Sequence, residues 1–141
     1  MKENYLTSWI EDMAFEAEIT GHKVLMDADD TVGGHDRGPR PKPLLIAALT
    51  GCTGMDVVSI LKKMQVQIDS FDIRTETELT EEFPKTYSKI HLIYEFTGKN
   101  LNENENKIKK AVKLSQDKYC GVSALYEKAL ELSYEVKIIE K

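Results

Sequence analysis

The amino-acid sequence predicts a single α+β domain with antiparallel strand pairing. Residues 44–64 form a nearly continuous apolar run of the length of a buried helix. Residues 73–79 and 90–96 alternate apolar and polar side chains, which is typical of strands with one solvated face. At 141 residues the chain has the length of one domain, and no repeat or linker divides it. We therefore expect one domain over residues 1–141.

The first third of the chain is predicted to hold two strands and a long loop. Residues 9–19 alternate loosely, and Thr20-Gly21-His22 is typical of a hairpin turn that leads into a returning strand at 23–26. Residues 27–43 contain three glycines and three prolines among charged side chains. This composition favours a long loop, and long loops in compact domains are often functional.

The apolar run is expected to be the central helix of the fold. Its first residues, 44–49, are apolar on every side, and the apolar surface narrows beyond Cys52. A helix that is apolar all round has to be buried, so Cys52 should lie well inside a buried helix.

The remaining elements follow from shorter patterns. The strands at 73–79 and 90–96 are joined by a turn at 81–85, and residues 102–118 have the spacing of a charged surface helix. Cys120-Gly121 interrupts that helix, residues 122–132 resume it, and a last strand covers 134–138.

Composition excludes some classes of partner and location. The net charge is −5 and the isoelectric point about 5.3, so a basic face for nucleic acid is not expected. Polar and charged residues interrupt the apolar run, and the N-terminus lacks the apolar core of a secretory signal, so we expect no membrane span. These features predict a soluble cytoplasmic protein, in which thiols are kept reduced.

The two cysteines, Cys52 and Cys120, are the residues with chemistry of interest. They form neither a CxxC motif nor a zinc-ligand set, and the three histidines are scattered, so we expect no metal and no cofactor. From the residues alone, they are either two buried small side chains or a functional thiol pair.

Two segments carry a family resemblance. One runs from VGG (32–34) through GPRP (38–41) to LTGCTGMDVVSILKKM (49–64), and the other is KYCGVSALY (118–126). Together they resemble the superfamily of osmotically induced protein C (OsmC) and organic hydroperoxide resistance (Ohr) proteins, in particular its uncharacterised OsmC-like branch. The resemblance implies an OsmC-like fold, in which curved antiparallel sheets surround two long central helices in an intertwined homodimer.

The resemblance also implies an activity, which is thiol peroxidase chemistry on organic hydroperoxides as part of a stress response. Cys52 would attack the peroxide and become a sulfenic acid, and Cys120 would then form a disulfide with it. A dithiol reductant, a lipoyl group or similar, would reset the pair by exchange.

Such chemistry needs a thiolate, and an arginine is the expected source of positive field. A helix dipole contributes only about 0.3–1 kcal/mol near its first turn. A guanidinium at about 4 Å supplies on the order of 4 kcal/mol at an effective dielectric constant near 20. Arg40 of the GPRP segment is the first candidate and Arg37 the second.

One departure from the family pattern keeps another function open. Peroxide-reducing relatives carry a glutamate nine or ten residues before the first cysteine, where this chain has Pro43 and Lys42. The alternative is a dimer of the same fold that binds a small apolar ligand or senses redox state without catalysis.

Overall fold

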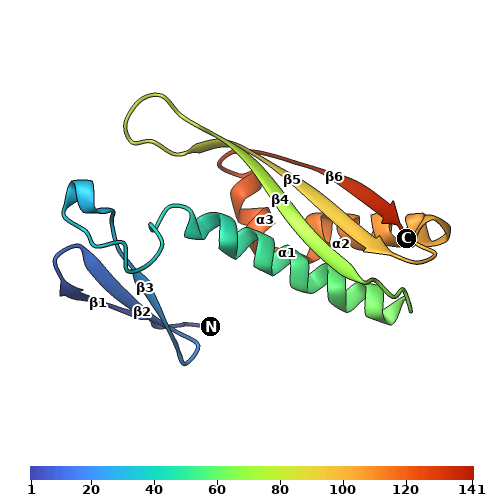
Figure 1. Ribbon diagram of the computed structural model, residues 1–141, viewed down its shortest axis with the longest axis horizontal. Helices are drawn as coiled ribbons and strands as arrows, with labels where there is room; N and C mark the ends of the chain where they lie inside the picture. Colours follow the sequence, from blue (N-terminus) through green and yellow to red (C-terminus); the bar gives the residue numbers. More distant parts are fainter. The chain divides into compact units, whose positions relative to one another are not determined.

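The computed structural model describes residues 1–141, which fall into two compact units, Met1–Ala47 and Ala48–Lys141. Figure 1 shows the elements, and each unit is described by itself. The mixture of helices and two small sheets confirms the α+β prediction. In chain order the elements are β1 (Leu6–Glu11), β2 (Ala14–Ile19), β3 (His22–Met26), the 3-10 turn η1 (Asp30–Val32), α1 (Leu44–Lys63), β4 (Ser70–Leu79), β5 (Tyr87–Gly98), the 3-10 turn η2 (Asn102–Asn104), α2 (Glu105–Leu114), the π-turn η3 (Ser115–Tyr119), α3 (Gly121–Glu127) and β6 (Glu131–Glu140).

The N-terminal unit is built on a three-stranded antiparallel sheet in the order β1-β2-β3. The hairpin at Thr20-Gly21 is confirmed, and both residues have the positive φ that such a turn requires, 49° and 80°. The single strand expected over residues 9–19 is wrong, because a turn at Asp12, with φ 49°, divides it into β1 and β2.

A buried carboxylate orders the loop that follows β3. Asp27 is 2% exposed and accepts hydrogen bonds from Arg37 Nε at 2.8 Å and from the backbone N–H groups of Ala28 and His35 at 2.8 and 3.1 Å. The Arg37 guanidinium, with these N–H groups, holds the pKa of Asp27 well below its usual range. At Gly38 a Cβ atom would collide with the Leu25 carbonyl oxygen, so only glycine allows the loop to lie against β3.

The interaction of Asp27 with Arg37 predicts how the stability of the N-terminal unit depends on acid pH. Because the pKa of Asp27 is depressed in the folded chain, its stabilisation is complete above the unfolded value of about 3.9 and is lost as the pH falls through the folded value. Trp9 is the one tryptophan of the chain, so its fluorescence during a urea titration reports the unfolding of this unit. Asp27→Asn should lower the urea midpoint at neutral pH and flatten its dependence on pH below about 4. Asp30→Asn, at an exposed carboxylate, is the control. If the urea midpoint depended on acid pH equally in all three proteins, Asp27 would not be the group that stabilises this unit.

The sheet of the C-terminal unit has the order β4-β5-β6. β4 and β5 are antiparallel as predicted, but β6 pairs with β5 in parallel, so the expectation of antiparallel pairing is wrong for the last strand. The reason is the crossover through α2 and α3, which returns the chain to the end of the sheet where β5 begins. The predicted helix over 122–132 also ends early, at Glu127, because pairing with β5 begins at Glu131.

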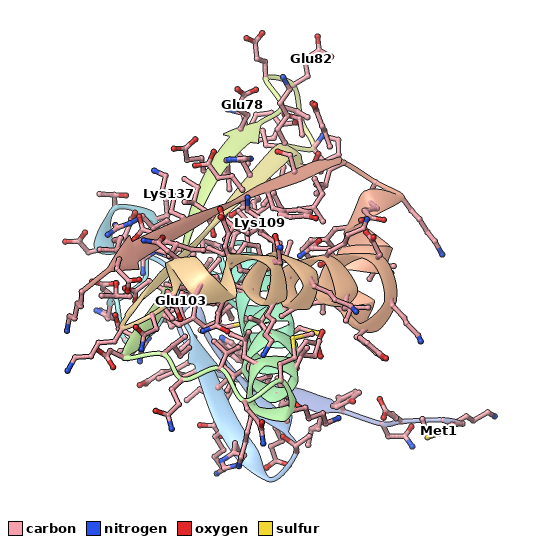
Figure 2. All side chains as sticks on the ribbon, turned by 90° about the vertical axis from the view of Figure 1, so that its right-hand side faces the viewer. Met1, Glu78, Glu82, Glu103, Lys109 and Lys137 are labelled. Atoms are coloured by element: carbon pink, nitrogen blue, oxygen red, sulfur yellow. The ribbon has the colours of Figure 1, made fainter.

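The core of this unit lies between the sheet and its helices, which cover one face of β4-β5-β6 (Figure 1). β5 contributes the fully buried Leu92, Tyr94 and Phe96, and α2 contributes Ile108 and Val112. The labelled charged side chains of this unit, among them glutamates on the β4–β5 hairpin and lysines on α2 and β6, project from its surface (Figure 2). The interior is therefore apolar except around α1.

Only one stripe of α1 is buried, which corrects the prediction of burial on all sides. The stripe repeats every fourth residue and consists of Leu49, Thr53, Val57 and Leu61. Outside it, Met55 is 76% exposed in the single chain. By length and composition alone α1 would also span a membrane, contrary to expectation, although core helices of soluble proteins have the same properties. The packing of α1 is that of a core helix with one apolar side left exposed in the single chain.

Candidate active site

The site is built where two cysteines distant in sequence come together. Cys52 lies on α1, and Cys120 immediately precedes α3. Their sulfurs and a carboxylate oxygen of Asp56 all lie within 4.8 Å of one another. Asp56 follows Cys52 by four residues, so the two side chains share one face of the helix. Both cysteines are free thiols.

A widened helical turn brings Cys120 to α1. The Cys120 N–H donates to the Ser115 carbonyl at 2.7 Å, five residues earlier, and the π-turn Ser115–Tyr119 results. Ser115 and Gln116 are buried in this turn, and Cys120 is buried directly after it. Such turns inside or after α-helices are frequent at functional sites.

The two sulfurs differ in exposure. Cys120 is 2% exposed, whereas Cys52 is partly accessible. Burial raises the pKa of the Cys120 thiol, and hydrogen bonding from Ser123 opposes that rise without cancelling it. The Ser123 N–H lies 3.4 Å from Cys120 Sγ, and the neighbouring Cys52 thiol raises the pKa further. The buried cysteine is therefore kept as a thiol, and Cys52 is the sulfur that a solute reaches.

A buried chain of hydrogen bonds ends at Asp56. Gln116 Nε2 lies 2.6 Å from the Tyr94 hydroxyl, which lies 2.7 Å from Thr53 Oγ1. Thr53 Oγ1 lies 2.7 Å from Ser115 Oγ, which lies 2.9 Å from Asp56 Oδ2. An amide NH₂ group only donates and a carboxylate only accepts, so every hydroxyl between them donates toward Asp56. Burial raises the pKa of Tyr94, which keeps it a donor.

A role for Asp56, or for the buried hydrogen bonds that end at it, was not predicted from the sequence. Asp56 is the one acidic residue of α1, four positions after Cys52, and this spacing is a signal that the sequence offers. No pattern in the sequence indicates Tyr94 or Ser115, because they reach the site only through the packing of β5 and η3 against α1.

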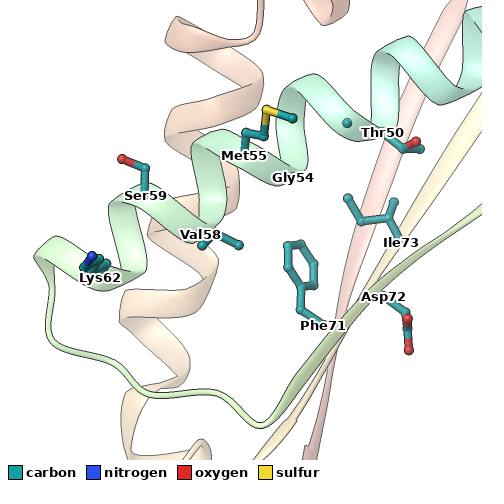
Figure 3. A pocket seen from close by; sticks show the side chains of 10 residues that line it. Thr50, Gly54, Met55, Val58, Ser59, Lys62, Phe71, Asp72 and Ile73 are labelled. Carbon is teal, nitrogen blue, oxygen red and sulfur yellow. The ribbon is translucent and has the colours of Figure 1, made fainter. Parts of the chain in front are cut away.

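Several hollows lie along α1 in the C-terminal unit, and two of them bear on the site. One, of about 380 Å³, is lined by Asp56, Ser59, Ile60, Lys63, Met64, Leu114 and Tyr119, and so includes the carboxylate that lies near both sulfurs. The other, of about 710 Å³, lies between α1 and β4. Figure 3 shows Met55 and Val58 of the helix at this second hollow, with Phe71 and Ile73 of the strand across from them. In both of these hollows the apolar surface is larger than the polar surface.

Comparison with known proteins identifies the family. The family model for OsmC-like proteins matches residues 34–135, which include both cysteines and Asp56. The chain belongs to the OsmC-like family. Membership was predicted from the two cysteine segments, and that prediction is confirmed.

Relatives of this OsmC-like chain cover nearly all of its length. Protein YhfA of Escherichia coli strain K12 is 32% identical over 132 residues, 93% of this chain and 94% of YhfA. A hypothetical protein from Aquifex aeolicus VF5 has a similar crystal structure, with a TM-score of 0.80 at 28% identity over 99% of both chains. An organic hydroperoxide resistance protein OsmC from Legionella pneumophila, also described as a predicted redox protein, has a TM-score of 0.65 at 17% identity over 97% of both chains. The last similarity shows the fold alone.

The predicted site residues of this OsmC-like protein fall into two groups. Cys52 and Cys120 are brought together within the C-terminal unit. The two arginines belong to the N-terminal unit, where Arg37 pairs with Asp27 at 2.8 Å and Arg40 pairs with Asp36 at 2.6 Å. Their activating role stays a prediction.

Proposed function

We propose that this OsmC-like protein reduces organic hydroperoxides, with Cys52 and Cys120 as its reacting dithiol. The observation that supports the proposal most directly is the approach of the two sulfurs within 4.8 Å. Cys52, partly accessible on α1, is the attacking sulfur, and the buried Cys120 is the resolving one. Reorientation of the two side chains then brings the sulfurs to the bond length of a disulfide, about 2.05 Å.

The reaction is a two-electron exchange. The Cys52 thiolate attacks the terminal peroxide oxygen, the O–O bond breaks, and the alkoxide leaves as an alcohol after taking a proton. Cys120 then attacks the sulfenic sulfur of Cys52, the disulfide forms, and water leaves with the oxygen and the proton of the Cys120 thiol. A dithiol reductant, such as dihydrolipoamide, returns both cysteines to thiols and leaves as its own disulfide.

The 380 Å³ hollow that Asp56 lines favours an organic peroxide over hydrogen peroxide. Its wall includes Ile60, Met64 and Leu114, which offer an apolar surface to the organic part of a substrate. Asp56 is one of the lining residues, and a carboxylate oxygen of Asp56 lies within 4.8 Å of both sulfurs. A substrate held by its apolar part in this hollow therefore places its peroxide group near Cys52.

We propose that the positive charge of Arg40 stabilises the Cys52 thiolate, with Arg37 as the second candidate. The one arginine of the C-terminal unit, Arg74, is paired with Glu95 at 2.9 Å on the sheet. A cation from the N-terminal unit, of the same chain or of its partner, is the remaining source of guanidinium charge. Turnover should fall in Arg40→Ala.

The exposed apolar surfaces support a homodimer as the working form. Met55 and Val58 leave an apolar strip on α1 uncovered in the single chain. One face of the N-terminal sheet likewise exposes Trp9, Phe15 and Ile19, and that unit buries little beyond Ala14, Ala17 and Asp27. Contiguous apolar surfaces of this kind mark interaction sites, and a second copy of the chain supplies matching surfaces.

Met55→Glu tests the homodimer. In a two-fold interface the substitution introduces a charge from each copy, which should raise the dissociation constant of the dimer at least about a hundredfold. Sedimentation over a range of concentrations measures it, with Lys110→Glu on the exposed side of α2 as the charge-changing control. A Met55→Glu protein as dimeric as the control would rule α1 out of the interface.

The activity is tested by cumene hydroperoxide consumption with dihydrolipoamide as reductant. Steady turnover by the wild type supports the peroxidase. The 710 Å³ hollow favours a second function, binding of a small apolar ligand without catalysis. Absence of turnover with both thiols confirmed reduced, together with an apolar compound that copurifies with the chain, would replace the peroxidase by this function.

A further inference from the structure

The reduced cysteine pair and Asp56 have the chemistry of a metal-ligand set. Two sulfurs and one carboxylate oxygen lie within 4.8 Å of one another, which fits three donors around a single ion. Cys52 and Asp56 come from adjacent turns of α1, and Cys120 comes from the start of α3. Two rigid elements therefore hold the three donors, as ligand sites in proteins require.

The surroundings of the three donors also fit a metal site. Asp56 Oδ2 accepts a hydrogen bond from Ser115 Oγ at 2.9 Å, so the buried row of hydrogen bonds orients the carboxylate. The other carboxylate oxygen is then available to bind an ion. Ser123 Oγ is fully buried and has no hydrogen-bond partner. The backbone N–H of the same residue lies 3.4 Å from the Cys120 sulfur, so Ser123 is a direct neighbour of that sulfur. An unpaired buried hydroxyl beside a sulfur is the donor that a metal-bound thiolate uses.

We propose that the reduced protein binds one Zn²⁺ ion through Cys52 Sγ, Cys120 Sγ and a carboxylate oxygen of Asp56. Zinc takes sulfur and carboxylate ligands, whereas Mg²⁺ and Ca²⁺ prefer oxygen ligands alone. Three protein ligands leave the fourth tetrahedral position open to water or a small anion. Binding converts both thiols to thiolates, so two protons are released for each ion bound.

Zinc binding and peroxide reduction exclude each other at this site. A bound ion occupies both sulfurs and withholds them from a hydroperoxide, and a disulfide has no thiolate to offer an ion. Zinc would therefore keep the pair reduced and inactive until a stronger chelator removes it. The zinc site itself does not rest on the peroxidase proposal, because it requires only the reduced thiols and Asp56.

The test titrates the reduced, metal-free full chain with Co²⁺ in the absence of oxygen and peroxide. Cobalt bound to thiolates gives an intense near-ultraviolet charge-transfer absorption, which should saturate at one ion per chain and disappear on addition of Zn²⁺. The peroxide-oxidised protein should give none. Cys120→Ser should lose most of this absorption, and Asp56→Asn should weaken binding at least about tenfold.

The controls separate loss of a ligand from loss of the fold. Asp72→Asn, at an exposed carboxylate of β4, should leave the affinity unchanged, and circular dichroism of each metal-free variant reports whether it is folded. Absence of the charge-transfer absorption in the reduced wild type, or an affinity of folded Asp56→Asn equal to that of Asp72→Asn, would overturn the proposed site. Because both of these results are obtained with the reduced protein, either one leaves the peroxidase proposal untouched.

Discussion

Cys52→Ser is expected to abolish turnover of organic hydroperoxide, with a loss of at least about three orders of magnitude, as when the attacking nucleophile of a covalent mechanism is removed. A serine hydroxyl at this position has no accessible anionic form near neutral pH, and oxygen does not form the sulfenic intermediate. Consumption of cumene hydroperoxide with dihydrolipoamide measures the rate. Wild-type rates in Cys52→Ser would show that the pair is not the reacting centre.

Cys120→Ser is the matched variant, since it removes the other sulfur and keeps the attacking one. It should still consume one equivalent of hydroperoxide in a single turnover and then accumulate a sulfenic acid on Cys52, which a dimedone-type reagent traps. This asymmetry follows from the exposure of the two residues, because Cys52 is partly accessible and Cys120 is 2% exposed. Trapping of the sulfenic acid on Cys120 in the Cys52→Ser protein would reverse the assigned roles.

Thr53→Val should produce the largest loss of stability among single changes at the site. Thr53 is fully buried, accepts from the Tyr94 hydroxyl and donates to Ser115, and valine has its shape without its hydroxyl. The substitution leaves Tyr94 without an acceptor and Ser115 without a donor. Each buried polar group that loses its partner costs about 1–3 kcal/mol. The free energy of unfolding from urea titration measures the loss.

Ser59→Ala is the control for Thr53→Val, because it removes a hydroxyl from the exposed side of the same helix. Its unfolding free energy should stay within about 0.5 kcal/mol of the wild type, as for most surface changes. If Thr53→Val were as mild as the control, the chain of hydrogen bonds from Gln116 to Asp56 would not contribute to stability.

Much of the fold was predictable from local patterns, and the misses have a common cause. The central helix was expected over residues 44–64 and is found at Leu44–Lys63, because its apolar run is long and unmistakable. The parallel pairing of β6 was not predictable, since strand direction depends on the crossover through α2 and α3 and not on the pattern of β6 itself. Burial of α1 was overestimated for a similar reason, because the pattern of a helix does not say which molecule covers each side.

The candidate site was predictable where the sequence carries a distinctive motif. Cys52 and Cys120 stand out in the segments TGCTGM and KYCGVS, and the structure places their sulfurs together. The contribution of Tyr94 depends on long-range packing, since a tyrosine on a strand reads as an ordinary core residue until Thr53 and Gln116 are seen beside its hydroxyl. The predicted roles of Arg37 and Arg40 await the Arg40→Ala rate.

Formation of the disulfide tests the Cys52–Cys120 pair most directly. The reduced protein is treated with one equivalent of cumene hydroperoxide, alkylated and digested with trypsin, which yields the peptides 38–62 and 119–128. The predicted result is a single new species in which these two peptides are joined, with loss of both thiols per chain and with reversal by dihydrolipoamide. Full consumption of the peroxide with both cysteines recovered as alkylated thiols would contradict the thiol mechanism.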